Sequence, residues 1–309
     1  MLQKGVRLGL CDFHVHSTAS DGRLTPDELV IEASAAGLEG FALADHDTLA
    51  GVPGGLARAE HTGLLFVPAV ELSVDLHSGG SAHLLGYFPG VDIDELMDPG
   101  SELIKALEFI IRGRETRNPA IVERFRQLGF QITMEGVLEE AGDSVVGRPH
   151  IASVLVKKGL VSSSSEVFDR YLAAGKPAYV ERKRLGDYRA ISLILQAGGL
   201  PVLAHPVYLP AADRNALGAI IASLADAGLK GLEAYYPEHD ASMVSFLVKT
   251  AVKRSLLLTG GSDFHGIKNP LPGWNQGTYG VETDMISEFT AICRERTANG
   301  KTERPCKKD

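Results

Sequence analysis

Two histidines lie one residue apart near the start of the chain, directly after the short apolar run 6–11. If this segment forms a strand, successive side chains point to opposite faces, so His14 and His16 share one face. Two imidazoles on one face at a strand end are suited to bind the same metal ion. The spacing therefore predicts the first part of a metal site that other segments must complete.

Further histidines and carboxylates follow or interrupt short apolar runs along the chain. Each one alone is as compatible with a turn or a core histidine as with a metal ligand. Their recurrence, which takes in most of the 10 histidines, indicates one site assembled from many strands. The candidate metal ligands are His14, His16, Asp21, His46, Glu71, His83, His205, Asp263 and His265.

The composition of this set indicates the chemistry. Imidazole and carboxylate without thiolate suit Mn, Fe, Zn or similar divalent ions. The set holds more ligands than one ion needs, which predicts a cluster of two or three ions bridged by a carboxylate and a water. Such a cluster lowers the pKa of the bridging water and neutralises an anionic substrate. Hydrolysis of phosphate esters is therefore the expected reaction.

Composition describes an ordinary globular protein. The chain has 309 residues, 44% of them hydrophobic, and a mean hydropathy of +0.02. No apolar run approaches membrane-spanning length, and the beginning of the chain lacks a secretory pattern. The 3 cysteines form no disulfide framework, so we expect a cytoplasmic protein.

The pattern of apolar runs predicts alternating strands and helices over residues 6–90 and again from 188 onward. In the second region we expect helices at 188–197, 212–227 and 240–253 and strands at 201–204, 231–235 and 256–259. Such alternation is typical of a parallel sheet or barrel. Ligands at the ends of so many strands favour a barrel, because closure brings those ends to one mouth.

Between residues 98 and 190 the pattern changes to successive helices, which we expect at 101–117, 119–128, 134–141, 149–158 and 164–173. We therefore predict a discontinuous metal-binding barrel over 1–97 and 191–296, a substrate-binding helical insert over 98–190, and a disordered tail over 297–309. The insert has a slight excess of basic residues, whereas the rest of the chain is acidic. This balance is unsuited to a broad nucleic-acid-binding face but suits a small anionic ligand.

Gly147-Arg-Pro-His150 stands out within the insert because it precedes a predicted helix start. An arginine fork, an adjacent imidazole and free N–H groups together make a phosphate clamp, for which we propose Arg148 and His150. The candidates for a second basic contact to phosphate are Lys176, Arg182, Lys183 and Arg184. Other arginines of the insert, such as Arg112, Arg114 and Arg117, are expected to form a solvated helix face.

Together these motifs resemble the PHP (polymerase and histidinol phosphatase) superfamily. The resemblance runs in order from residue 8 to about 280. It is carried by Asp12-Phe-His-Val-His16-Ser-Thr-Ala-Ser-Asp21-Gly, Ala44-Asp-His-Asp47, Glu71, His83-Leu-Leu-Gly-Tyr87, Ala204-His-Pro206 and Gly261-Ser-Asp-Phe-His265. It implies a distorted seven-stranded (β/α) barrel with two or three metal ions, and none of the family's nine ligand positions is replaced here. The Gly-Arg-Pro-His element further resembles the branch of nucleoside 3′,5′-bisphosphate phosphatases and 5′→3′ exoribonucleases.

The resemblance also implies roles for single residues. His14, His16, Glu71 and Asp263 would hold one ion, Glu71 would bridge to a second held by His83 and His205, and Asp21, His46 and His265 would hold a third. A metal-bridging hydroxide would attack phosphorus, so the catalytic residues would be His14, His16, Glu71, His205 and Asp263. Asp12, Asp45 and Asp47 are expected to orient imidazoles.

The leading hypothesis is a metal-dependent phosphatase or exonuclease acting on small nucleotides or on the 5′ end of RNA. One alternative is histidinol-phosphate phosphatase, against which the helical insert argues. Another is a noncatalytic metal-bound scaffold, against which the complete ligand set argues. A barrel amidohydrolase or isomerase is a further alternative, disfavoured because no strand-end lysine is suited to bridge two metals. The physiological substrate, the metal, the protein partners and the oligomeric state stay open.

Overall fold

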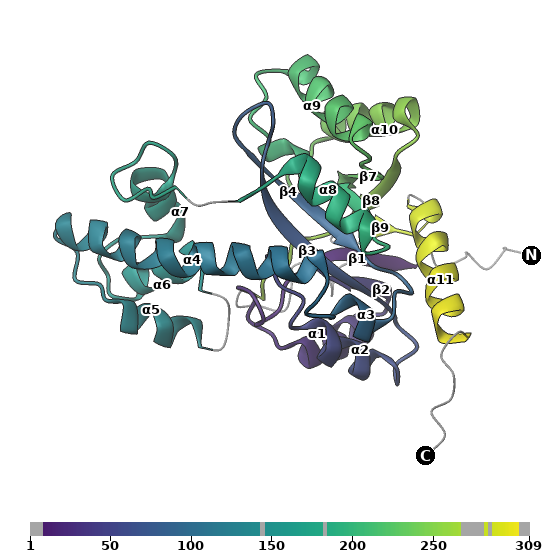
Figure 1. Ribbon diagram of the computed structural model, residues 1–309, viewed down its shortest axis with the longest axis horizontal. Helices are drawn as coiled ribbons and strands as arrows, with labels where there is room; N and C mark the ends of the chain where they lie inside the picture. The colour runs from purple at the N-terminus through teal and green to yellow at the C-terminus, as the bar shows by residue number, and fades with distance from the viewer. Residues whose placement is uncertain (1–8, 143–145, 182–183, 267–280, 284–285, 303–309) are drawn as a thin grey trace, which may run out of the picture.

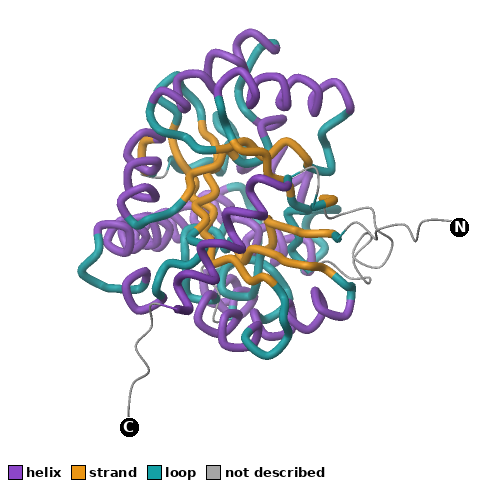
Figure 2. Tube along the Cα trace, turned by 90° about the vertical axis from the view of Figure 1, so that its right-hand side faces the viewer, coloured by secondary structure: helices purple, strands orange, loops and turns teal. Residues whose placement is uncertain are grey.

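A mixed sheet forms the centre of the computed structural model, which describes residues 9–142, 146–181, 184–266, 281–283 and 286–302. Figure 2 shows its strands in the middle of the molecule, with helices outside them. The strand order is β8-β7-β6-β4-β3-β2-β1-β9, with β5 paired to β3. Their bounds are β1 Leu10–Val15, β2 Leu38–Leu43, β3 Leu65–Asp75, β4 Ser81–Tyr87, β5 Leu185–Gly186, β6 Leu200–Leu203, β7 Gly231–Tyr235, β8 Leu257–Gly260 and β9 Val281–Glu282.

The predicted α/β class is confirmed, but the sheet is not wholly parallel. Strand β4 runs antiparallel to both of its neighbours, β3 and β6, and β9 is antiparallel to β1. The short turn after Asp75 explains the first pairing, because it joins β3 directly to β4 as a hairpin. Closure into a seven-stranded barrel stays a prediction. The segment that follows β8 contacts the end of β1, where the His16 N–H donates to the Phe264 carbonyl oxygen at 2.8 Å.

Apolar side chains pack on both faces of the sheet, as the alternation along β2 illustrates. Phe41 belongs to the core beneath the outer helices, whereas Ala42, the next residue, packs with Tyr87 and Phe289 on the other face. In Figure 1, α1, α2 and α3 lie below the strands and α9 and α10 above them, and all five helices contribute buried residues to the same core as Phe41. The helix bounds are α1 Pro26–Ala35, α2 Val52–Ala59, α3 Ile93–Leu96, α8 Asp187–Gln196, α9 Arg214–Asp226, α10 Ala241–Arg254 and α11 Ser287–Thr302.

A separate group of helices extends from the sheet along α4, Glu102–Gln127 (Figure 1). Its other members are α5 Met134–Ala141, α6 Arg148–Lys157, α7 Ser164–Val167 and a short π-helix, Phe168–Leu172. These helices have a hydrophobic cluster of their own, which includes Ile121, Phe125 and Ile151. We call this group the helical layer.

The structure corrects two boundaries expected from the sequence. One continuous α4 replaces the two helices expected at 101–117 and 119–128, although Pro119 lies inside it. Proline in a helix interior costs ~3 kcal/mol, but α4 buries apolar side chains on both sides of it, among them Ile110 and Phe125. The expected tail from 297 begins within α11, which continues to Thr302 because propagating a formed helix is easier than nucleating one. Residues 303–309 lie outside the described residues.

No helix in the described ranges combines the length and the apolar character needed to span a membrane.

Candidate metal centre

Glu71 is the centre of the candidate site. It is fully buried in the middle of β3, not at a strand end as the sequence suggested. A bridge between His46 and Glu71 aligns the loop after β2 with this strand. Five imidazoles face its two carboxylate oxygens: His46 Nδ1 at 2.7 Å, His83 Nδ1 at 2.8 Å, His205 Nε2 at 2.9 Å, and the Nε2 atoms of His14 and His16 at 3.4 Å each.

The loop after β1 and the segment after β8 complete the site at the carboxyl end of β1. Asp263 Oδ1 lies 3.0 Å from His16 Nε2 and 3.5 Å from His14 Nε2. This approach depends on Gly261, because a Cβ atom there would lie 2.5 Å from the backbone nitrogen of His14. Asp21 joins from the loop after β1, with its Oδ1 3.3 Å from His265 Nε2.

Eight of the nine predicted ligands form three overlapping groups in which one ligand atom per residue lies within 4.8 Å of the others. Each group could hold an ion. They are His14, His16, Glu71 and Asp263; His16, Asp21, His46 and His265; and His46, Glu71 and His83. The first matches the set that the resemblance implied, and the second adds His16 to the expected third set. His205 belongs to none of the three groups, although it lies beside Glu71. In the group with Glu71 and His83, His46 occupies the position that was expected for His205.

The charges of the site fit a cation. Burial would raise the pKa of the Glu71 carboxyl, but the surrounding imidazoles, His46 first among them, hold it well below its usual range. Burial would lower the pKa of His46, but Glu71 and Asp21 outweigh it and raise this pKa to about 9. His16 is the opposite case, since burial and the neighbouring His265 lower its pKa to about 3.

Several ligand atoms are buried without a hydrogen bond in the described structure. They include His14 Nε2, both ring nitrogens of His16, and Glu71 Oε2. A buried polar atom without a partner costs free energy, which coordination of a divalent ion would recover. The donor set therefore fits a metal, and the site consists of His, Asp and Glu groups able to bind one.

The carboxylate that supports the imidazoles is one that sequence reasoning missed. Glu233, in β7, is fully buried, and its Oε1 lies 2.9 Å from His14 Nδ1. A glutamate inside the apolar strand Gly-Leu-Glu-Ala-Tyr was the available signal, since charged residues are rarely fully buried without a partner.

The aspartates expected to orient imidazoles fasten the loops that carry the ligands. Asp45 accepts hydrogen bonds from the Ser17 N–H at 2.7 Å and the Ser20 hydroxyl at 2.6 Å. Asp12 accepts from the Ser262 N–H at 2.9 Å, beside the ligand Asp263. These bonds shape the ligand-bearing loops, and the predicted role of these aspartates in orienting imidazoles stays a prediction.

A cavity of about 230 Å³ opens beside the ligands, between the sheet and the helical layer. Four arginines line it together with Phe168 and the ligands Asp21, His46 and His83; the arginines are Arg114, Arg117, Arg148 and Arg184. Arg114 and Arg117 are buried, so the prediction that they form a solvated helix face was wrong for them, whereas Arg112 is exposed.

Arg148 reaches this cavity from the first turn of α6. Its guanidinium lies over the Phe168 ring, 5.4 Å from the centroid, and donates to the Leu172 carbonyl oxygen at 3.3 Å. Burial and the neighbouring Arg184 and Arg114 lower the pKa of Arg148. Guanidinium groups gathered at one cavity favour an anionic ligand.

The other predicted phosphate contacts differ in placement. His150 accepts a hydrogen bond from the Gly147 N–H through Nδ1 at 3.0 Å, and so closes the start of α6. Arg182 and Lys183 lie outside the described residues. Arg184 lines the cavity and pairs with Asp75 at 2.8 Å.

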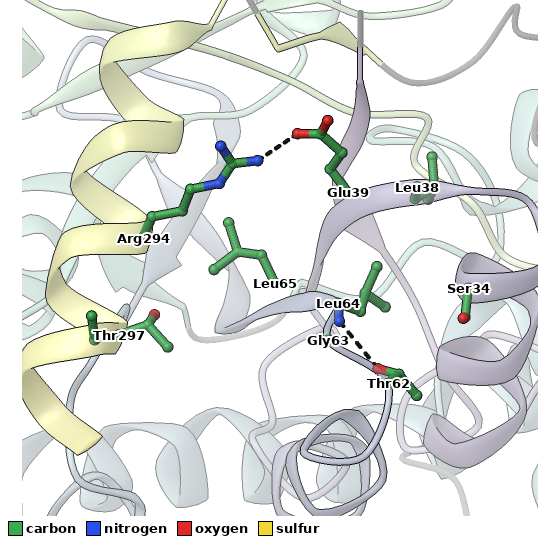
Figure 3. Close-up of a pocket in the computed structure, with 10 residues that line it drawn as sticks. Ser34, Leu38, Glu39, Thr62, Gly63, Leu64, Leu65, Arg294 and Thr297 are labelled. Atoms are coloured by element: carbon green, nitrogen blue, oxygen red, sulfur yellow. Dashed lines mark hydrogen bonds and ion pairs between the residues drawn. The ribbon is translucent and has the colours of Figure 1, made fainter. Parts of the chain in front are cut away.

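A larger cavity, of about 570 Å³, lies at the opposite, amino-terminal ends of β2 and β3 (Figure 3). Its walls include Leu38, Leu64 and Leu65. Its arginine, Arg294, is directed toward Glu39, with which it forms an ion pair (Figure 3). None of the nine candidate ligands lines this cavity, whereas three of them line the smaller one.

Comparison with known proteins gives a consistent result. The model of the PHP domain family matches residues 12–184. The 3′,5′-nucleoside bisphosphate phosphatase of Chromobacterium violaceum is 32% identical over 92% of this chain and 93% of its own. The 5′-3′ exoribonuclease Rnm of Escherichia coli K12 is 33% identical over 82% and 84%. A structure described as a metal-dependent phosphoesterase, from Bifidobacterium adolescentis, is 31% identical with a TM-score of 0.76 over 93% of this chain and 96% of that one.

Proposed function

This chain belongs to the PHP domain family and is a metal-dependent phosphoesterase, and from that premise we propose that it removes phosphate from nucleotides carrying a second phosphate group. The substrate class is a nucleoside 3′,5′-bisphosphate or the 5′-phosphorylated end of a short RNA. The observation that carries this proposal is the group of arginines in the cavity beside the ligand cluster.

In this proposal the nine ligands hold two or three divalent ions, Mn, Fe or Zn. When bound, such ions lower the pKa of a coordinated water and offset the charge of the phosphate under attack. The protein contributes a buried, water-poor setting. Glu71, at 0% exposure, is shared by two of the three ligand groups and so fixes the spacing between ions.

The arginines supply the recognition of the second phosphate. Arg148 fits this role because its described contacts are to a carbonyl oxygen and an aromatic ring. Neither of these partners carries a negative charge, so they do not neutralise the guanidinium. A bidentate arginine–phosphate contact is charge-assisted and directional. A substrate with one phosphate at the ligand cluster and another at Arg148 would span the cavity.

The division of the chain follows the same logic. We propose that residues 1–97 and 191–296 form the metal-binding part, as a distorted (β/α)7 barrel, and that 98–190 form a substrate-binding insert. The separate hydrophobic cluster of the helical layer supports the division. The contact between the end of β1 and Phe264 supports a sheet that curls toward closure.

The test is a substrate panel for the Mn-loaded protein, consisting of a nucleoside 3′,5′-bisphosphate, a nucleoside 5′-monophosphate, a 5′-phosphorylated oligoribonucleotide and histidinol phosphate. We expect kcat/KM to be highest for the bisphosphate or the oligoribonucleotide. Preference for histidinol phosphate, the earlier alternative, would overturn the substrate assignment.

A further inference from the structure

We propose that Glu233 is a positioning residue that sets the geometry of two candidate metal ligands, His14 and His205, at the same time. Glu233 lies in β7, is fully buried and is not among the residues that line the cavity beside the ligands. The inference rests on the proposed function only in that the centre must bind metal ions.

The two carboxylate oxygens of Glu233 have different partners. Oε1 lies 2.9 Å from Nδ1 of His14, on β1, and Oε2 accepts the backbone N–H of His205 at 2.6 Å, just after β6. A backbone N–H can only donate, so Oε2 must be an acceptor. If Oε1 accepts in the same way, the His14 proton lies on Nδ1.

The position of that proton decides what His14 can do. With Nδ1 protonated, the lone pair of a neutral imidazole is on Nε2. His14 Nε2 is buried without a hydrogen bond and lies 3.4 Å from Glu71 Oε1. Glu233 therefore directs the free nitrogen of His14 to the place where the ligand atoms converge.

The second bond acts on the backbone. His205 has a φ of 24°, a conformation that residues other than glycine seldom adopt. The hydrogen bond from its N–H to Glu233 holds this turn, and the turn directs His205 Nε2 to Glu71 Oε1 at 2.9 Å. The His14 and His205 rings then lie nearly parallel, 5.7 Å apart. One buried carboxylate thereby fixes the approach of two imidazoles to the same oxygen of Glu71.

The variant that tests this is Glu233→Gln, which keeps the size of the side chain. Its amide offers one acceptor and one donor group, so it cannot accept from both partners. Asp187→Asn is the matched control. Asp187 is also buried, and its two oxygens also accept backbone N–H groups, from His77 at 3.0 Å and Tyr188 at 2.8 Å, but it contacts none of the nine ligands through those bonds.

The readout is binding of Mn²⁺ to the chelator-treated full-length chain, measured by titration calorimetry, with the melting temperature of the metal-free protein measured in parallel. We expect Glu233→Gln to weaken Mn²⁺ binding roughly 10- to 100-fold, as loss of a supporting carboxylate typically does. Asp187→Asn should lose stability while keeping wild-type Mn²⁺ affinity. Wild-type affinity in Glu233→Gln, with or without lost stability, would overturn the proposal.

A measurement on the wild-type chain covers the case in which the variant does not fold. In a long-range ¹H–¹⁵N spectrum of the protein loaded with Zn²⁺, which is diamagnetic, His14 should carry its proton on Nδ1. A His14 ring protonated only on Nε2 would overturn the proposal. Neither readout uses phosphate release, so metal binding without hydrolysis would count against the proposed function and leave this inference standing.

Discussion

Arg114 of α4 donates to the buried carboxylate of Asp47, the residue that follows the candidate ligand His46. Asp47 also accepts the Ser73 N–H at 2.9 Å, two residues beyond Glu71 on β3. One ion pair thus ties the helical layer to the two segments that carry His46 and Glu71. Because Arg114 also lines the cavity, the pair links the arginine side of the cavity to the ligand side.

Replacing Arg114 by alanine should be strongly destabilising. The change leaves Asp47 buried without its guanidinium, which typically costs ~3–5 kcal/mol. Urea denaturation of the metal-free protein measures the free energy of unfolding. Arg112→Ala, two residues earlier on the exposed face of α4, is the control and should change stability by less than ~0.5 kcal/mol. Equal effects of the two variants would contradict the role given to the ion pair.

Protein purified without chelator and supplied with Mn should hold two or more ions per chain. The reason is that three groups of ligands converge on shared residues, and a single ion would leave several buried donor atoms unsatisfied. Elemental analysis against protein concentration gives the stoichiometry. Exhaustive chelation should abolish phosphate release, and Mn should restore it. One ion or fewer at saturation would rule out a cluster.

Glu71→Gln should abolish hydrolysis and lower the number of bound ions, because Glu71 belongs to two ligand groups. Elemental analysis and phosphate release are measured on the same preparation. His61→Ala is the control, since His61 is exposed, and it should be near neutral. If His61→Ala were equally damaging, the assignment of the nine candidate ligands would be contradicted.

His239, which like His61 is not one of the nine candidate ligands, does not suit as a control. It is buried, and its Nδ1 lies 2.9 Å from the Ala234 carbonyl oxygen. We therefore expect His239→Ala to destabilise the fold.

Arg148→Ala should separate two classes of substrate. Loss of a desolvated arginine–phosphate contact typically costs ~2–4 kcal/mol, so kcat/KM for a nucleoside 3′,5′-bisphosphate should fall roughly 30- to 1,000-fold. An aryl phosphate, which has no second phosphate, should be hydrolysed almost as fast as by the wild type, and metal content should stay the same. Equal losses on both substrates would place Arg148 at the reacting phosphate or in the fold.

The stability of the metal-free protein should fall as pH rises from 6.5 to 9. The folded-state pKa of His46 is raised from 6.5 to about 9, so its contribution is fully present below pH 6.5 and is lost as pH rises through the folded value. This contribution is on the order of 3 kcal/mol. Melting temperatures of chelated protein across this window test it, with the Mn-loaded protein for comparison. Mn binding should strengthen over the same window, because ligands must lose their protons to bind. A rising melting temperature in the chelated protein would contradict the assignment.

Local patterns predicted much of this site because its ligands follow strand geometry. The alternation that puts His14 and His16 on one face is a property of any strand, and runs of apolar residues marked where strands end. The same reasoning misplaced Glu71, since β3 continues past it into a hairpin that apolar pattern alone does not distinguish from a strand end.

The residues that sequence reasoning missed depend on tertiary contacts. Arg114 and Arg117 have the spacing of a solvated helix face, and only the packing of α4 beside the cavity shows that they are buried. Glu233 supports ligands on β1 and after β6, and no local spacing encodes that relationship. The His150 ring caps the start of α6, which its sequence motif did not indicate, and its predicted contact with phosphate stays a prediction.

The junction between β1 and the segment after β8 has a consequence for biosynthesis. Of the nine candidate ligands, His14 and His16 leave the ribosome first, and Asp263 and His265 leave it last. Two of the three ligand groups need one of these late residues, and the remaining group is His46, Glu71 and His83. A nascent chain stopped before β8 would hold only that remaining group. Hydrolytic competence would therefore appear only after the segment that follows β8 has been translated, and a polypeptide truncated before that segment would be inert toward phosphate esters.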